Sequence, residues 1–150
     1  MVTVYDTHLT KDQQLRYTMQ LVEGRTLQEF LLYHQQPEAV SENYLSEVIN
    51  MFTRLCETLA FVHDKGVVHL DLKPENIILG QYGEVKIMDW GNAYLYDPRF
   101  YEDYVRKFQK EASEANIELE VRDGILGTPL YMSPEQTLSR NGLGPASDIF

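Results

Sequence analysis

The longest periodic pattern of apolar residues along the chain lies between Ser41 and Gly66. Apolar residues recur there at steps of three and four positions, at Leu45, Val48, Ile49, Phe52, Leu55, Cys56, Leu59 and Val62. This spacing places them on one face of an α-helix. The pattern therefore predicts a helix that opens at Pro37 and Ser41 and ends at Gly66. Cys56 is expected to be a small, inert core residue on its buried face.

Short apolar runs predict strands before this helix. Val2–Tyr5 and Arg16–Val22 are rich in β-forming residues, and the polar segment Asp6–Gln14 between them is expected to be a turn. Thr26 is followed three positions later by Glu29, which is the capping-box pattern. This part of the chain is therefore expected to hold two strands and then a short helix.

A second pair of strands is predicted after the long helix. Ile77–Leu79 and Val85–Ile87 flank the turn-forming segment Gly80–Gly83, which favours a β-hairpin. Beyond it, apolar residues at helical spacing predict one amphipathic helix inside a long, charge-rich connection, at Phe100, Tyr104, Val105 and Phe108. The chain is thus expected to contain both short strands and helices.

Composition and charge narrow the possible functions. The 150 residues are 43% hydrophobic and 24% charged, which is typical of a folded soluble protein. The net charge of -10 argues against nucleic acid or an anionic membrane as the main partner, because these ligands attract basic surfaces. The single cysteine excludes an intrachain disulfide framework. With no apolar run of membrane-spanning length and no signal-peptide pattern at Met1, a cytoplasmic location is expected.

Three short segments carry chemical groups. The segment from His69 to Asn76 (HLDLKPEN) combines acid, base and amide side chains, Asp89-Trp90-Gly91 follows a predicted strand, and GTPLYMSPE ends at Glu135. Phosphoryl transfer needs a carboxylate near the attacking hydroxyl, a cation at the moving phosphoryl group and oxygen ligands for Mg²⁺. Taken singly, each residue fits a structural role better than a catalytic one, Asp71 as a turn residue and Asp89 as a cap after a strand.

In this order and at this spacing, the three segments resemble the catalytic loop, the DFG motif and the APE motif of the protein kinase superfamily. The resemblance covers essentially the whole chain, and Lys73 followed by Pro-Glu-Asn is similar to serine/threonine-specific members. It implies a partial protein-kinase-like fold of the α+β class. It also implies ATP, Mg²⁺ and a protein substrate, with no nucleic acid and no membrane segment within the chain.

The resemblance implies catalytic and metal-binding roles residue by residue. Asp71 would be the catalytic base, and Lys73 would contact the γ-phosphate of ATP. Asn76 and Asp89 would ligate Mg²⁺. Thr128 would hydrogen-bond both Asp71 and Lys73.

It also implies where the nucleotide binds. Met19 falls at the gatekeeper position, and the backbone of Gln20 and Val22 would be the hinge that meets adenine. Ile78 would form the floor beneath the adenine. Asp148 resembles the buried helix-F aspartate that holds the backbone of the catalytic loop.

The sequence departs from the family pattern at two places in the catalytic half. Leu70 replaces the Arg that usually precedes the catalytic Asp, and Leu has no charge with which to bind a phosphorylated activation segment. We therefore expect activity that does not depend on such phosphorylation. The activation segment from Asp89 to Glu135 is long, and residues 92–125 are interpreted as a solvated helical insertion in preference to a docking surface.

The chain also lacks family motifs. It contains no Gly-x-Gly-x-x-Gly loop and no Val-Ala-Ile-Lys-like strand before the expected hinge. Residues 1–22 are therefore expected to be the end of the small lobe, two strands and the hinge. Residues 23–150 would be the large lobe up to the start of helix F, with activation segment 89–135. The chain is expected to be a fragment that is inactive alone.

Three functions are compatible with these features. The first is a serine/threonine protein kinase, and the second is a kinase-like, non-catalytic binding or scaffold module. The third, a small-molecule phosphotransferase, is disfavoured because the Lys73-Pro-Glu-Asn and GTPLYMSPE segments resemble those that serve a peptide acceptor. The presence of Asp71, Lys73, Asn76 and Asp89 together favours the kinase.

Overall fold

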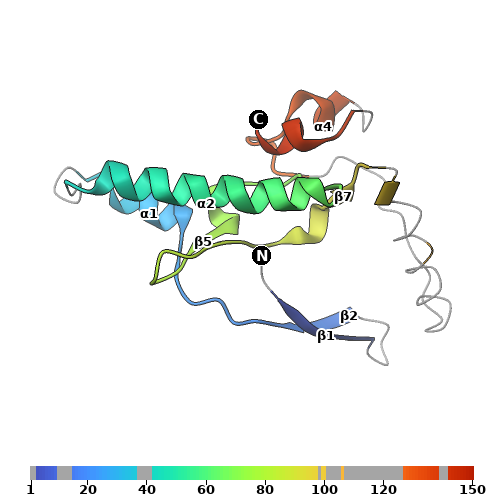
Figure 1. Cartoon of the computed structure of the whole chain (residues 1–150), viewed down its shortest axis with the longest axis horizontal. Helices are drawn as coiled ribbons and strands as arrows, with labels where there is room; N and C mark the ends of the chain where they lie inside the picture. The colour runs from blue at the N-terminus through green and yellow to red at the C-terminus, as the bar shows by residue number, and fades with distance from the viewer. Residues whose placement is uncertain are drawn as a thin grey trace. The chain divides into compact units, whose positions relative to one another are not determined.

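The computed structural model describes residues 3–9, 15–36, 42–97, 99–100, 106, 127–138 and 142–150 (Figure 1). The chain divides into two compact units, residues 1–58 with 73–89 and residues 59–72 with 90–150. Short strands and helices alternate in both, as expected for a partial α+β kinase-like fold. Within the described ranges, no helix combines the length and the apolar composition needed to cross a membrane.

The first unit opens with an antiparallel hairpin of β1 (Val4–Leu9) and β2 (Leu15–Met19). The bounds predicted for these two strands, Val2–Tyr5 and Arg16–Val22, differ from the observed ones. Strand β1 continues to Leu9 although a turn was expected from Asp6, because its polar residues pair in register across the hairpin, with His8 opposite Arg16. Strand β2 ends at Met19 instead of continuing to Val22.

A three-stranded sheet forms the centre of the first unit. Its order is β3 (Arg25–Thr26), β5 (Ile77–Leu79) and β6 (Val85–Ile87), and all neighbours are antiparallel. The predicted β5–β6 hairpin is confirmed. Gly24 precedes β3 with φ +147°, and a Cβ there would lie 2.3 Å from the carbonyl oxygen of Leu79. Only glycine fits this close approach of two strands.

Helix α1 (Leu27–Tyr33) begins with the predicted capping box. The hydroxyl of Thr26 accepts a hydrogen bond from Glu29 N at 3.0 Å, and Glu29 Oε2 accepts one from Thr26 N at 2.7 Å. The helix buries Phe30, whose ring stacks on Tyr44 at a centroid distance of 5.9 Å. Tyr44 opens α2 (Tyr44–Asp64), so this aromatic contact holds α1 beside the start of the long helix (Figure 1).

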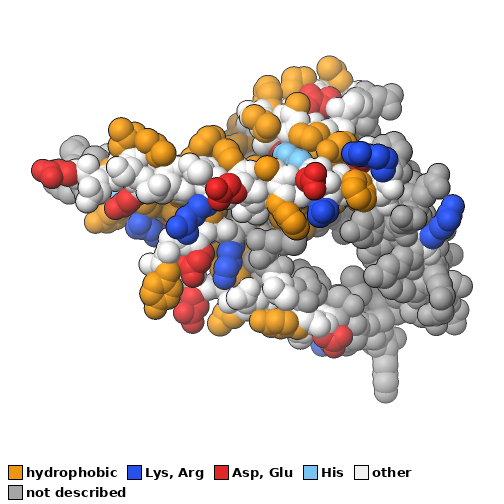
Figure 2. Space-filling model, viewed as in Figure 1, with side chains coloured by type: hydrophobic (Ala, Val, Ile, Leu, Met, Phe, Trp, Pro, Cys, Tyr) orange, Lys and Arg blue, Asp and Glu red, His pale blue; other side chains and the backbone are white. Residues whose placement is uncertain are grey.

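The apolar residues of α2 form two stripes, where one buried face was expected. Leu59 and Val62 are buried, and Val48, Met51 and Leu55 along the same stripe are half-buried. Leu45, Ile49, Phe52 and Cys56 are exposed on the neighbouring stripe (Figure 2). The prediction that Cys56 is a core residue was therefore wrong. A helical period shows which residues share a face, but the contacts of the fold decide which face is covered.

The second unit contains the end of α2 and the strands that follow it. Gly66 ends the helix as predicted, with φ +74° and its N–H donating to His63 O at 2.9 Å. Strand β4 (Val67–Val68) then pairs with β7 (Tyr94–Leu95) in antiparallel register.

The remaining described elements of this unit are short: η3 (Trp90–Asn92), α4 (Pro134–Leu138) and η4 (Pro145–Asp148). The two-residue strand β4 leads directly into His69. Most of the helix predicted around residues 100–108 lies outside the described residues. The part of the predicted insertion 92–125 that follows residue 106 lies outside them as well.

Candidate active site

The catalytic-loop segment, defined as His69, Leu70 and Asp71, is buried in the second unit. It follows strand β4, and a single carboxylate holds its start. Asp148, whose side chain is fully buried, accepts hydrogen bonds from His69 N at 2.8 Å and from Leu70 N at 2.8 Å. The Nε2 atom of His63 lies 2.8 Å from the same carboxylate. Asp148 thus satisfies two buried backbone donors, as the family resemblance implied.

Leu70 has a backbone conformation that is unusual for its side chain. Its φ is +63°, in the left-handed region, which costs a non-glycine residue roughly 1–2 kcal/mol. Its side chain is buried, so no charge stands at the position where the family has Arg. The backbone is held on both sides, because Leu70 N donates to Asp148 and Leu70 O accepts from Gln136 Nε2 at 2.8 Å. These hydrogen bonds offset the conformational cost.

Asp71 is 6% exposed and is hydrogen-bonded to the side chains of Thr128 and His69. Its carboxylate accepts a hydrogen bond from the hydroxyl of Thr128 at 2.6 Å, the contact that the sequence resemblance implied. Its backbone N–H donates to His69 Nδ1 at 3.2 Å. The His69 ring is packed edge-on against Trp90 at a centroid distance of 4.6 Å, so His69 is a packed residue that supports the loop. The Asp71 carboxylate is therefore fixed in orientation before any substrate is present.

Sequence reasoning missed two residues beside this loop. Gln136 on α4 is buried and bonds Leu70 O, and Gly127 allows the close packing around that bond. Gly127 has φ +124°, and an added Cβ would lie 2.7 Å from Leu70 O and 2.9 Å from Gln136 Nε2. The pattern Ser133-Pro-Glu-Gln136 is a capping-box signal that pointed to part of the role of Gln136.

Glu135, the last residue of the Ser-Pro-Glu motif, faces the end of the chain within the same unit. Its Oε1 accepts a hydrogen bond from the hydroxyl of Ser147 at 2.5 Å. This bond holds the pKa of Glu135 below its usual value, and a hydrogen bond from the backbone N–H of Glu135 contributes less to the same shift. Glu135 therefore stays ionised and ties α4 to η4 near Asp148.

The predicted metal ligands belong to the first unit. Asn76 is buried at the end of η2 (Pro74–Asn76), and Asp89 is exposed after β6 with φ +55°. The backbone brings them close, because Asn76 O accepts a hydrogen bond from Met88 N at 2.8 Å. One amide oxygen and one carboxylate are hard oxygen donors that suit Mg²⁺. In the part of the chain that the structure describes, no group of three or more His, Cys, Asp or Glu side chains is arranged to hold a metal ion.

The residues expected around ATP also lie in the first unit. Lys73 is half-buried and precedes η2. Met19, Gln20 and Val22 are half-buried in the segment that follows β2, and Gln20 N donates to Thr3 O at 2.8 Å. Ile78 is half-buried at the centre of β5. The roles of these five residues in nucleotide binding stay predictions.

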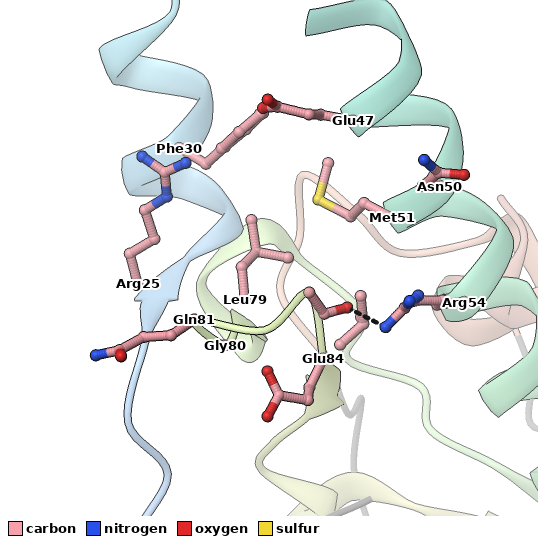
Figure 3. Close-up of a pocket in the computed structure, with 12 residues that line it drawn as sticks. Arg25, Phe30, Glu47, Asn50, Met51, Arg54, Leu79, Gly80, Gln81 and Glu84 are labelled. Carbon is pink, nitrogen blue, oxygen red and sulfur yellow. Dashed lines mark hydrogen bonds between the residues drawn. The ribbon is translucent and has the colours of Figure 1, made fainter. Parts of the chain in front are cut away.

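A separate cavity of about 480 Å³ lies in the first unit between α1, α2 and the β5–β6 turn (Figure 3). Its lining mixes apolar and charged side chains, and Met51 and Leu79 point into it between Arg25 and Arg54. Arg54 Nη1 donates to Gly83 O at 2.5 Å and so holds the turn against α2. None of the predicted site residues lines this cavity.

Comparison with known proteins gives one family. The family model of the protein kinase domain matches residues 1–150. A serine/threonine-protein kinase PknD of Protochlamydia amoebophila is 37% identical over 130 residues, covering 83% of this chain and 13% of that protein. The PknD of Chlamydia pneumoniae is 34% identical over 155 residues, covering 100% of this chain and 16% of that protein. The PknD of Chlamydia muridarum is 33% identical over 142 residues, covering 84% of this chain and 14% of that protein. The chain thus spans only 13% to 16% of the length of these relatives.

Proposed function

Since the chain belongs to the protein kinase family, we propose that the protein is a serine/threonine protein kinase, which transfers the γ-phosphoryl group of ATP to Ser or Thr hydroxyls of a protein substrate. One observation carries this proposal. The buried Asp71 is held by Thr128 at 2.6 Å and follows loop backbone whose N–H groups at His69 and Leu70 are bonded to Asp148. The acceptor class is supported by Lys73-Pro-Glu-Asn and by the similarity to serine/threonine-protein kinases.

Asp71 would act on the acceptor hydroxyl. The hydroxyl oxygen forms a bond to the γ-phosphorus while the bond from that phosphorus to the β–γ bridging oxygen breaks, which releases ADP. The hydroxyl proton passes to the carboxylate of Asp71. The hydrogen bond from the Thr128 hydroxyl to Oδ1 would hold this carboxylate in place for the transfer. Lys73 would neutralise charge on the moving phosphoryl group.

Asn76 and Asp89 would hold Mg²⁺, which the family generally uses together with ATP. When bound, the cation neutralises phosphate charge. The contribution of the chain is to place an amide and a carboxylate oxygen on backbone that the Asn76–Met88 hydrogen bond holds together. Because Asp89 is exposed, its carboxylate is accessible to a metal–nucleotide complex arriving from solvent.

Adenine would bind the first unit. We assign the gatekeeper to Met19, the hinge to the backbone of Gln20 and Val22, and the floor to Ile78. The chain would then divide into a small-lobe part, 1–22, and a large-lobe part, 23–150, with activation segment 89–135. We also expect a cytoplasmic location. The 150 residues alone are expected to transfer no phosphate, because their sequence contains no Gly-rich loop and no lysine strand.

The test compares wild type with Asp71→Asn in the full-length gene product, including any segments that flank these residues in the gene. Transfer from ATP–Mg²⁺ to a generic Ser/Thr peptide is followed by mass spectrometry, and ATP binding by calorimetry. Loss of the base is expected to lower kcat on the order of 10²- to 10⁴-fold with ATP binding retained. Asp64→Asn is the matched control, because Asp64 has a 78% exposed side chain and is expected to leave kcat unchanged.

Three results contradict the proposal in different ways. Equal transfer by wild type and Asp71→Asn removes Asp71 as the base. ATP binding without any transfer by wild type supports the second function, a non-catalytic kinase-like binding module. Transfer to a small molecule in place of the peptide supports the third.

A further inference from the structure

Gln136 connects the end of the activation segment to the catalytic-loop segment. It lies on the short helix α4, is 6% exposed and uses both ends of its side-chain amide. Oε1 accepts a hydrogen bond from Ser133 N at 3.0 Å, and Nε2 donates to Leu70 O at 2.8 Å. The bond to Leu70 joins residues that are 66 positions apart in the sequence.

The orientation of this amide follows from its partners. Ser133 N–H is a donor and therefore needs the oxygen of the Gln136 amide, while the carbonyl oxygen of Leu70 needs its NH₂ group. A flipped amide would place two donors together at Ser133 and two acceptors together at Leu70. The hydrogen bonds thus determine the amide orientation, and its NH₂ group points at the catalytic-loop segment.

The peptide group that receives this bond is the one that joins Leu70 to Asp71. Its carbonyl accepts from Gln136, and its N–H donates to His69 Nδ1 at 3.2 Å. Leu70 is at φ +63°, so this peptide would tend to rotate if either bond were lost. Loss of these bonds would release the backbone at Asp71, and its side chain would no longer be held in a fixed direction toward Thr128.

We propose that Gln136 is a positioning residue for the phosphoryl-transfer reaction: its amide holds the Leu70–Asp71 peptide so that the Asp71 carboxylate stays aligned with the acceptor hydroxyl. This inference rests on the proposed kinase function. Because the two hydrogen bonds described above join Gln136 to backbone atoms, it acts through the backbone of the loop.

The chemistry of the amide explains why glutamine is needed at this position. A Glu side chain has the same shape and would accept from Ser133 N, but its ionised carboxylate would face Leu70 O with no proton to donate. A Leu side chain would fill the space and donate nothing. The space itself is tight, because an added Cβ at Gly127 would lie 2.9 Å from Gln136 Nε2.

The first experiment measures steady-state kinetics of full-length wild type, Gln136→Leu and Gln136→Glu with ATP–Mg²⁺ and a Ser/Thr peptide. Misalignment of a catalytic group by about 1 Å costs on the order of 10²-fold in rate. At pH 8 we expect kcat to fall roughly 10- to 100-fold in both variants, with KM for ATP within about twofold of wild type. Gln28→Glu, at an exposed position of α1, is the matched control and is expected to leave kcat unchanged.

The second measurement repeats the kinetics of Gln136→Glu at pH 6. Burial raises the pKa of a carboxyl group, so the introduced carboxyl becomes protonated at a pH where exposed carboxylates are still ionised. The protonated form can donate to Leu70 O as the amide does. Because the titratable side chains of Asp71, His69 and Glu135 lie near this position, each rate is divided by the wild-type rate at the same pH. We expect this ratio to rise about tenfold from pH 8 to pH 6, which a role in packing alone does not produce.

Each outcome decides the inference. An unchanged kcat in Gln136→Leu, or a pH-independent ratio in Gln136→Glu, overturns it. If wild type transfers no phosphate, the proposed function fails, and crystal structures then test the positioning directly. In Gln136→Leu we expect the Thr128 Oγ1–Asp71 Oδ1 separation, 2.6 Å in wild type, to exceed about 3.5 Å. An unchanged separation overturns the inference whether or not the protein is a kinase.

Discussion

Leu70 and Asp89 are the two non-glycine residues with positive φ in the described part of the chain, and their surroundings differ. Leu70, at φ +63°, is buried, and both its N–H and its C=O are hydrogen-bonded to side chains from distant parts of the sequence. Asp89, at φ +55°, is exposed. An Asp tolerates this conformation better than a Leu, because its short polar side chain can bond locally.

The difference matches the tasks that we propose for the two loops. A catalytic base must keep its orientation throughout the reaction, so the loop that ends at Asp71 is held rigidly by buried partners. A metal ligand can be oriented by the cation when it binds, so Asp89 needs less support from the protein. The strain at Leu70 is therefore compensated by tertiary contacts, whereas that at Asp89 is small from the start.

The largest expected effect follows from removing the carboxylate that holds the loop. Asp148→Ala leaves the N–H groups of His69 and Leu70 buried without that acceptor, and each such loss costs about 1–3 kcal/mol. We expect the free energy of unfolding to fall by about 3–5 kcal/mol in urea denaturation. The control Asp64→Ala removes an exposed carboxylate and is expected to change it by less than about 0.5 kcal/mol. Similar values for both variants would show that the loop does not depend on Asp148.

A smaller effect is expected from a methyl group placed against the loop. Gly127→Ala puts a Cβ 2.7 Å from Leu70 O at φ +124°, and we expect it to lower the free energy of unfolding by about 2–4 kcal/mol. Gly142→Ala is the matched control at φ +92°, where the added methyl meets no described atom within 4 Å. It should cost only the backbone strain, about 1–2 kcal/mol. If thermal denaturation shows that Gly127→Ala and Gly142→Ala lose the same free energy of unfolding, the packing at Leu70 is not tight.

The smallest effect on stability is expected at Asp89, and it sharpens the comparison most. In Asp89→Gly the relief of backbone strain offsets the greater chain entropy of glycine, so we expect a change within about 0.5 kcal/mol. Leu70→Gly removes a buried side chain as well and should cost about 2–5 kcal/mol. Binding of Mg²⁺–ATP, measured by calorimetry, should weaken in Asp89→Gly. A large loss of stability there would show that the Asp89 loop is held as tightly as the Leu70 loop.

Local features of the sequence predicted several elements correctly. The Thr26–Glu29 capping box and the hairpin of Ile77–Leu79 with Val85–Ile87 are confirmed, because both depend on residues a few positions apart. The family and the α+β fold are confirmed as well. Catalytic motifs are also short segments, so the sequence sufficed to nominate Asp71 and Asp89. Their roles, like those of the other predicted site residues, stay predictions.

Features that depend on distant contacts were missed or misjudged. The apolar pattern of α2 merged two stripes, so Cys56 was expected inside although it is exposed. Gln136 was not singled out, because its partner Leu70 lies 66 positions earlier and only its bond to Ser133 has a local signal.

The sequence by itself determined the family, the chemical groups of the proposed reaction and the elements set by near neighbours. It did so because motif spacing, capping and turn formation are local properties of the chain. The tertiary structure decided which stripe of α2 is covered and how Asp71 is held. Those outcomes depend on Asp148, Thr128 and Gln136, which are brought to the loop from 57 or more positions away. Contacts over such separations are determined only when the whole unit packs.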